Sequence, residues 1–495
     1  MLRPWELNLT VSRVSSQSIH QQLTHKLIHV IQTGAFAVGT PLPGSRELSQ
    51  QLGINRKTVI RVYDELVAQG WLYSEDKRGT FVRQQQPVES ANFLSSLQAL
   101  PQQHTTTLHL EQPAYAHHDL SEDTFDLSYP YGDSRLFNLQ ALVRATRHAL
   151  IATKRQHPLK LHGLAPLCQA IAHMLNFEQG MDVAAEQLLI TPSAQTSLQI
   201  VASTLFAKGD YVVLEALHAP ATAAAFKKNH AHIQTVKHHQ HGVDIDDLEK
   251  LCINYPVRAI YVSPECQQPT TWRMSTDNRA QLLKLAKRYD FYVIEDHMHA
   301  SFQYAKHSLP TLASIDQAER VIYLGSLAHM LNASYRASYI ISPQQLHATF
   351  VQKLNTINDS HDQLQTLALT ELLLSGEVKK QLKRAQKIYL ERRDHFCQLL
   401  KQALGDAVKC EIPSAGFAVW VQWQTEATEI MLVERMQQAV LTLDTSTVYQ
   451  HDQTGRISMR IYFAHLNLEE QKSVIKRLKK SILAQPKPLQ YAAFG

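Results

Sequence analysis

Glycine and cysteine are both scarce in this sequence. Its 495 residues include 17 glycines, below the average share of about 7%, and only five cysteines. The cysteines are odd in number and are not clustered as metal ligands; they stand at positions 168, 252, 266, 397 and 410. We therefore expect neither a zinc site nor a disulfide framework. Reduced thiols in a cytoplasmic protein are the plain interpretation.

Long apolar runs are absent as well. No uninterrupted apolar stretch reaches the roughly 18 residues that a membrane span needs. The opening MLRPWELNLT has no apolar core followed by a small-residue cleavage site, which argues against a secretory signal. The net charge of +5 is too small to identify a nucleic-acid binder unless the cations gather in one place. With 44% hydrophobic and 19% charged residues, the composition excludes a disordered or coiled-coil chain.

Three regions of different composition follow one another. Residues 11–83 form a compact segment with regular turn signals. Residues 84–123 are polar and rich in glutamine, which predicts a linker. Residues 124–485 alternate short apolar runs, such as DYVVLEA and FYVIEDH, with amphipathic stretches. That alternation predicts an α/β domain with a mostly parallel sheet.

The first region carries the pattern of a helix-turn-helix. We expect one helix over Ser45–Leu52, a tight turn at Gly53, and a longer helix over Arg56–Ala68. Apolar residues keep one face of the longer helix for packing. Its first turns are cationic and polar, with Arg56, Lys57, Thr58 and Arg61. A recognition helix meets base edges in the major groove with such N-terminal residues.

A hairpin wing is expected after the second helix. Two strand-like runs flank the turn at residues 75–79, and Lys77 and Arg78 at its tip would face phosphates or the minor groove. The alternative is a small helical domain whose charges are merely solvated. The stretch LPGSRELSQQLGINRKTVIRVYDELVAQGWL, with RGTFV after it, resembles the winged helix-turn-helix of GntR-type bacterial regulators. By that resemblance the partner is double-stranded DNA. The residues that it implies in DNA contact are Arg46, Arg56, Lys57, Thr58 and Arg61, with Gly79 shaping the wing.

The larger domain resembles the fold type I aminotransferases, which use pyridoxal phosphate. The motifs that carry the resemblance are TPSAQTSLQIVASTLFAKGDYVVLE, VSPECQQPTTWRMS, FYVIEDHMHASFQY, VIYLGSLAHMLNASYRASYIIS and SMRIYFAHL. Together with the first region, this domain resembles the MocR (GabR-like) regulators over almost the whole chain. The resemblance implies a homodimer, and a small α+β subdomain at residues 375–485 of the domain at 124–485.

The same resemblance assigns jobs to single residues. Asp296 matches the aspartate that pairs with the pyridine nitrogen. Arg336 matches the arginine that holds the cofactor phosphate, and Arg460 matches the late arginine that clamps a substrate carboxylate. The positions that meet the phosphate are Ser193, Ala194 and Ser326. Without the family, an internal salt bridge of Asp296 with Arg336 and a solvated Arg460 are the simpler interpretations.

The lysine of the cofactor motif is missing. Family members place a lysine in a segment that here reads GSLAHML, and His329 occupies its position. Imidazole has no primary amine, so it forms no internal aldimine with pyridoxal phosphate. Other family positions also differ: Ala219 stands near the place of the ring-stacking tyrosine, Met298 replaces a tyrosine, and Thr271 replaces a glycine.

The histidines prompt a check for metal ligands. His297 and His299 would share one face of a strand, yet spacing indicates no third ligand, so no metal site is expected. The sequence thus predicts a transcriptional regulator with a degenerate aminotransferase-like effector domain. Pyridoxal phosphate is doubtful and, if bound, noncovalent, and a small amine or carboxylate is the expected effector. The alternatives are an aminotransferase or cofactor-responsive regulator using another lysine, and a purely structural dimer scaffold.

Overall fold

The structure is a computed structural model. It describes residues 18–75, 78–83, 124–153, 164–298, 302–305, 308–328, 330, 337–357, 362–424, 429–443, 448–451 and 456–483. The chain divides into two compact units, residues 1–116 and 117–495, and each is described by itself. The linker predicted at 84–123 lies outside the described residues, as do Lys77, His299, His329 and Arg336. In the described part, no helix is long and apolar enough to cross a membrane.

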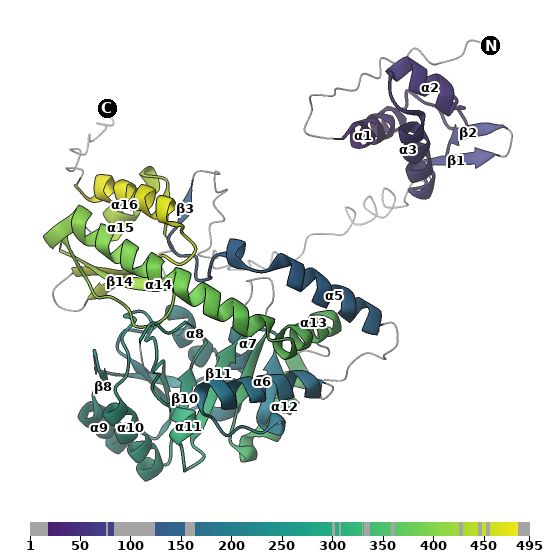
Figure 1. Ribbon diagram of the computed structural model, residues 1–495. Coiled ribbons are helices and arrows are strands. Elements are labelled where there is room, and N and C mark those ends of the chain that lie inside the picture. Colours follow the sequence, from purple (N-terminus) through teal and green to yellow (C-terminus); the bar gives the residue numbers. More distant parts are fainter. Residues whose placement is uncertain are drawn as a thin grey trace, which may run out of the picture. The chain divides into compact units, whose positions relative to one another are not determined.

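The first unit, whose described residues 18–75 and 78–83 we call the head, holds three helices and a hairpin (Figure 1). These are α1 (Ile19–Gln32), α2 (Ser45–Leu52), α3 (Arg56–Ala68), β1 (Leu72–Glu75) and β2 (Gly79–Val82). Both predicted helices of the helix-turn-helix are confirmed at both ends. Gly53 ends α2 in the left-handed conformation at φ +61°, which glycine adopts without a Cβ clash. A core that includes Leu23, Leu27, Val59 and Leu66 holds the helices together.

The second unit is built around a seven-stranded sheet in the order β4-β12-β11-β10-β9-β5-β6. Its strands are β4 (Leu188–Thr191), β5 (Tyr211–Glu215), β6 (His232–Val236), β9 (Val257–Val262), β10 (Tyr292–Asp296), β11 (Val321–Ser326) and β12 (Ser338–Ile341). Strand β12 runs antiparallel to both of its neighbours, and the other pairs are parallel. The predicted α/β class with a mostly parallel sheet is confirmed.

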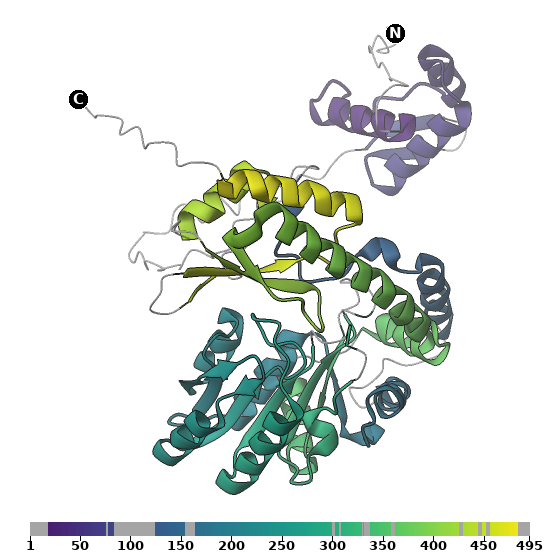
Figure 2. The same ribbon diagram turned by 60° about the vertical axis from the view of Figure 1, so that its left-hand side comes forward.

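Helices cover both faces of this sheet (Figures 1 and 2). They are α5 (Leu139–Thr153), α6 (Ala165–Gln179), α7 (Ala194–Leu205), α8 (Pro220–Lys228), α9 (Ile245–Asn254), α10 (Thr276–Tyr289), α11 (Leu312–Ile315), α12 (Gln344–Ile357) and α13 (Gln363–Leu374). Short elements between them are η3 (Ala185–Gln187), β7 (His238–His239) and β8 (Gly242–Val243). Because both faces are covered, the central strands are mostly apolar, and every residue of β10 and β11 is buried.

The chain from residue 377 to 483, the C-terminal subdomain, packs helices on a four-stranded antiparallel sheet of order β13-β14-β17-β16. Its elements are α14 (Glu377–Leu404), η4 (Gly405–Ala407), β13 (Val408–Cys410), β14 (Ala418–Trp423), α15 (Glu429–Gln438), β15 (Leu441–Thr442), β16 (Val448–His451), β17 (Arg456–Tyr462) and α16 (Leu468–Leu483). The start of the large unit joins it, since β3 (Phe125–Asp126) pairs with β15 and η1 (Ser134–Leu136) follows. An apolar core around Phe396, Trp423 and Phe463 fills this subdomain.

Candidate functional site

Helix α3 of the head presents a cationic N-terminal half to solvent. Asn55 caps it, because its Oδ1 accepts from the Lys57 N–H at 2.9 Å. Val59, Val62, Tyr63 and Leu66 are buried, which turns the opposite face outward. That outer face carries Arg56, Lys57, Ile60 and Arg61. The helix therefore has the charge and the exposure that contact with DNA requires.

Helix α2 contributes to the same surface of the head. Arg46 is exposed near its start. Nε of Arg56 donates to Oγ of Ser45 at 3.2 Å, which joins the first turns of α2 and α3. Thr58 is half-buried, and its N–H bonds to the carbonyl of Asn55 at 3.0 Å within the first turn of α3. Arg46 and Arg56 are thus presented by neighbouring helix starts.

The predicted wing is an antiparallel hairpin. Glu75 pairs with Gly79 at its tip, and Gly79 has φ +121°, a conformation that side chains disfavour. The side chain of Arg78 is 77% exposed and donates to Glu75 at 3.1 Å. Arg78 is therefore accessible at the tip of the wing, and a surface ion pair of this kind costs little free energy to break.

Ile60 is a surface residue of α3 that the sequence interpretation passed over. Its exposed fraction is 38%, and it lies among exposed cations on a helix whose other β-branched and aromatic residues are largely buried. A signal was present, because Ile60 falls four residues after Arg56 and so on the same face. Apolar side chains in the major groove contact the methyl group of thymine.

In the large unit, Asp296 ends strand β10 and is buried at 5% exposure. Its Oδ2 accepts from the hydroxyl of Tyr261 on β9, and its Oδ1 accepts from the Met298 N–H at 2.8 Å. Burial raises the pKa of Asp296. The hydrogen bonds from Tyr261 and Met298, together with the positive charge of Arg460, oppose that rise. Both carboxylate oxygens already have partners from this chain.

The three predicted phosphate positions lie at one end of the sheet. Ser193 caps α7, its Oγ accepting from the Thr196 N–H at 3.1 Å, and Ala194 opens that helix. Ser326 ends β11, and Ser338 on β12 pairs with both Ser326 and Thr191. Strand β12 therefore lies between the end of β11 and the end of β4, from which the chain continues into α7. The N–H groups at a helix N-terminus attract anions such as phosphate.

Arg460 lies on β17 and is 3% exposed, so it is not a solvated strand-end charge. Its Nη1 donates to the carbonyls of Gln267 at 3.2 Å and Pro269 at 3.0 Å, and its Nη2 lies 3.8 Å from Sγ of Cys266. Nε of Arg460 is buried without a partner among the described residues. Burial lowers the pKa of Arg460, but interactions with Tyr462 and Cys266 outweigh burial and raise it. The guanidinium is charged and already holds the 266–269 loop.

That loop departs from the family motif at a position where the backbone still has the geometry of glycine. Thr271 replaces the expected glycine and adopts φ +64°, in the left-handed region. Arg279, which is fully buried, anchors the start of the loop: its Nη2 donates a hydrogen bond to Oε1 of Glu265 at 2.7 Å. Gln267 Oε1 accepts from the Thr270 N–H at 2.8 Å. The loop is therefore held by its own side chains even with the replacement.

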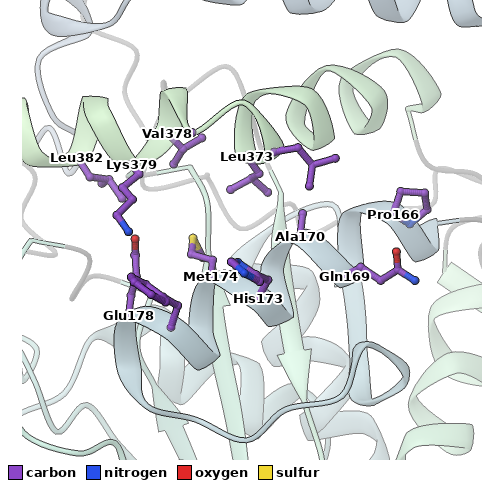
Figure 3. A pocket seen from close by; sticks show the side chains of 13 residues that line it. Pro166, Gln169, Ala170, His173, Met174, Glu178, Leu373, Val378, Lys379 and Leu382 are labelled. Carbon is purple, nitrogen blue, oxygen red and sulfur yellow. The ribbon is translucent and has the colours of Figure 1, made fainter.

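Two adjoining cavities are lined by residues other than Asp296, Ser193 and Arg460. One, of about 490 Å³, lies between α6 and the α13–α14 turn, where Lys379 and Glu178 point toward each other (Figure 3). The Lys379 ammonium lies 4.1 Å from the ring centroid of Phe177. The second, of about 420 Å³, is lined by His297, whose Nδ1 is buried and has no hydrogen-bond partner among the residues that the structure describes. Of the predicted cofactor residues that the structure describes, none lines either cavity. Within the described ranges, no three His, Cys, Asp or Glu side chains group as metal ligands.

Comparison with known proteins identifies both units. Residues 127–478 match the family described as aminotransferase class I and II, and residues 19–82 match the family described as bacterial regulatory proteins, gntR family. The chain belongs to the aminotransferase class I and II family. With its GntR head, it is a transcriptional regulator of the MocR type with an aminotransferase-like domain.

Related regulators share this arrangement along most of their length. The regulator is 26% identical over 410 residues to the probable rhizopine catabolism regulatory protein MocR of Rhizobium meliloti, covering 82% of each chain. It is 24% identical over 411 residues to the HTH-type pyridoxine biosynthesis transcriptional regulator PdxR of Corynebacterium glutamicum, covering 81% of this chain and 82% of PdxR. An archaeal alanine:glyoxylate aminotransferase superposes with a TM-score of 0.67 at 24% identity, covering 72% of this chain and 90% of that one. This likeness shows the fold.

The fold family binds pyridoxal phosphate in general, and the residues of this regulator fit that cofactor only in part. The α7 N-terminus and Ser326 offer donors suited to a phosphate, and Asp296 is a buried carboxylate suited to a pyridinium. The covalent anchor does not fit, because no lysine occurs between Lys306 and Lys353, and Lys353 lies in α12. The donor set therefore lacks the amine that a Schiff base needs. His218 directly precedes Ala219, which stands near the place of the family's ring-stacking tyrosine. Nδ1 of His218 lies 2.8 Å from the carbonyl oxygen of Glu215.

Proposed function

We propose that this regulator binds operator DNA through α3 and the wing, and that its aminotransferase-like domain senses an effector without forming an internal aldimine. The observation that carries the proposal is the lysine-free stretch of residues 307–352, which spans the cofactor-lysine motif. By the family architecture, the regulator acts as a homodimer in the cytoplasm, and its two heads meet two half-sites. Pyridoxal phosphate, if it binds, is held noncovalently.

DNA contact is assigned to two sets of residues. Arg46, Arg56, Lys57, Thr58 and Arg61 face the major groove, and Lys77, Arg78 and Gly79 form the wing that meets phosphate or the minor groove. The exposed cations of α3 support the first set. Replacing Arg56 or Arg61 by alanine should weaken operator binding by roughly 5- to 150-fold and reduce its salt dependence.

The measurement is a salt titration of affinity for an operator selected from random duplexes. Lys208→Ala is the matched control, since Lys208 is an exposed cation of the large unit. Equal affinities and equal salt slopes for wild type and both arginine variants would refute the recognition-helix assignment.

The effector is proposed to be a small carboxylate or amine that engages Arg460. A carboxylate would take Arg460 away from the carbonyls of Gln267 and Pro269, because Nη1 already donates to both. Binding would then release the 266–269 loop from β17. This gives the domain a physical route from ligand to conformational change, since the ligand and the loop compete for one guanidinium.

The missing aldimine is tested by the absorbance spectrum of the purified regulator after addition of pyridoxal phosphate, with borohydride reduction and peptide mass analysis. We expect no lysine-linked reduced adduct. His329→Lys is the matched variant, because it restores an amine at the family position, and an aldimine band that it gains would show that the rest of the site fits. A lysine-linked adduct at one stoichiometric site in the wild type would overturn the proposal.

Retention of Asp296, Ser193 and Ser326 favours one alternative, an aminotransferase or cofactor-responsive regulator that uses another lysine. Steady turnover of an amino donor and a keto acid, abolished by mutation of that lysine, would establish the enzyme. A purely structural scaffold is the third reading. It predicts that no small carboxylate or amine shifts the melting of the large unit.

A further inference from the structure

The thiols of Cys397 and Cys410 lie side by side in the C-terminal subdomain, outside the sites described above. Cys397 lies in the last two turns of α14, and Cys410 ends β13. The two side chains lie close enough to interact, and the Cys410 thiol also donates to the Glu411 carbonyl at 3.6 Å. Both residues are partly rather than fully buried. The regulator therefore carries a pair of neighbouring thiols that remain partly exposed.

Regular structure holds the pair together. Cys410 is paired opposite Val421 of β14, which fixes its place in the sheet. One turn before Cys397, Arg393 donates Nη1 to the carbonyl of Pro413 at 3.0 Å, so the same helix is tied to the chain that leaves β13. Both cysteines also pack against the apolar core of the subdomain. The thiols meet because a helix and a strand hold them there.

The two thiols have different chemical characters. The interaction with Cys410 lowers the pKa of Cys397, and the Arg393 guanidinium lowers it further, against the opposing effect of burial. The same interaction and burial raise the pKa of Cys410. Because the thiolate is the reactive form of cysteine, Cys397 has the character of the attacking sulfur. Cys410 lies where its sulfur can attack an oxidised Cys397 and form a disulfide with it.

We propose that Cys397 and Cys410 form a reversible oxidation site that a hydroperoxide converts to a disulfide. The Cys397 thiolate attacks one oxygen of hydrogen peroxide; the O–O bond breaks, and the leaving hydroxide takes up a proton to become water. Cys410 sulfur then attacks the resulting sulfenic acid, forming the S–S bond as the S–O bond breaks and a second water leaves. In sum, two thiols give two electrons to the peroxide, and a dithiol reductant restores them by exchange.

The disulfide would join the end of α14 to β13. This would fix the helix that leads from the large sheet into the C-terminal subdomain against the edge strand of the smaller sheet. The proposal is independent of DNA binding and of pyridoxal phosphate, since neither site contains these residues.

The test treats the full-length regulator with a small excess of hydrogen peroxide, blocks remaining thiols with N-ethylmaleimide, and maps tryptic peptides by mass spectrometry. We expect the peptide of residues 394–401 linked to that of residues 410–435, and no such link after dithiothreitol. Before oxidation at neutral pH, Cys397 should react with the maleimide at least about tenfold faster than Cys252, whose pKa burial raises to about 11.

Two serine variants test the order of attack. Cys410→Ser should leave Cys397 as a sulfenic acid that dimedone traps, whereas Cys397→Ser should leave Cys410 unlabelled by dimedone. Unchanged melting of both variants shows that the fold is kept. The proposal is overturned if the wild type yields no linked peptide, or if Cys397 passes directly to sulfinic acid. Equal oxidation of Cys252 and Cys397 would also overturn it.

Discussion

Buried polar residues gather at the carboxyl edge of the large sheet. Glu215 ends β5 and Asp296 ends β10, and Gln267 reaches from the neighbouring loop to Glu215 at 3.3 Å. Burial raises the pKa of Glu215 to about 8, more than the hydrogen bonds from Gln267 and Ser263 lower it. At neutral pH this carboxyl group therefore holds its proton in the folded state and loses it in the unfolded chain.

Glu215 should make stability depend on pH. The folded state binds the extra proton between the ordinary pKa of glutamate, about 4.5, and about 8, so its contribution falls as pH rises through that window. Glu215→Gln removes this loss, and the melting temperature of the variant minus that of wild type should rise from pH 5 to pH 8 and then level off. The exposed Glu186 provides the control Glu186→Gln, for which the difference should stay flat. A constant difference for Glu215→Gln would contradict the buried neutral carboxyl.

Ile60 carries a prediction about sequence recognition. Ile60→Ala should weaken binding to a selected operator by roughly 5-fold or more, because it removes contact with a thymine methyl. Replacing the contacted thymine by uracil, which lacks that methyl, should weaken wild type equally and leave the variant unaffected. If wild type binds every uracil-substituted operator as well as the original, Ile60 does not read a thymine.

At the scale of elements, local signals account for the head and long-range contacts for the rest. The bounds of α2 and α3 could be predicted because Gly53 and Asn55 mark their ends within the local sequence. The strands of the large sheet could be predicted from their apolar runs. The antiparallel direction of β12 could not, since it depends on pairing with both β4 and β11.

Asn55 should govern the stability of α3. Its side chain satisfies the Lys57 N–H, and loss of such a cap costs about 1 kcal/mol. Asn55→Ala should lower the melting temperature of the head and weaken operator binding, while Asn55→Asp, which keeps an acceptor oxygen, should retain the stability. Calorimetry on the full chain resolves the head transition if the units melt separately. Equal melting of the alanine and aspartate variants would show that the cap contributes nothing.

At the scale of the molecule, residues far apart in sequence define the candidate site. Arg460 donates hydrogen bonds to Gln267 and Pro269, which stand almost two hundred positions earlier. Tyr261 donates to Asp296 from the neighbouring strand. Sequence motifs indicated Asp296 and Arg460 through the family. The partner of Asp296 follows from the pairing of β9 with β10, and the partners of Arg460 follow from the packing of the C-terminal subdomain against the large sheet. The buried Asp133 links the start of the large unit to the same subdomain, accepting from Arg392 at 2.9 Å.

Asp133→Ala should destabilise the large unit by about 3–5 kcal/mol, because it leaves Arg392 with a buried, uncompensated charge. The free energy of unfolding in urea measures this. Glu469→Ala is the comparison, since Glu469 forms an exposed pair with Lys472 and its loss should cost less than about 1 kcal/mol. Similar losses for the two variants would show that burial of the Asp133 pair adds nothing.

The pairing of β4 with β12 also bears on how the chain is made. During synthesis, β4 is complete at Thr191, but its partner β12 begins only at Ser338. Likewise, β3 can pair only after β15 has been made, from Leu441 onward. The helices and hairpin of the head are complete by Val82. At about 5–20 residues per second, ribosomes therefore deliver a whole head tens of seconds before the large unit can close its sheet. During synthesis, the head is therefore complete before the domain that we propose to sense an effector, and strand edges on the nascent large unit stay unpaired until their partner strands are made.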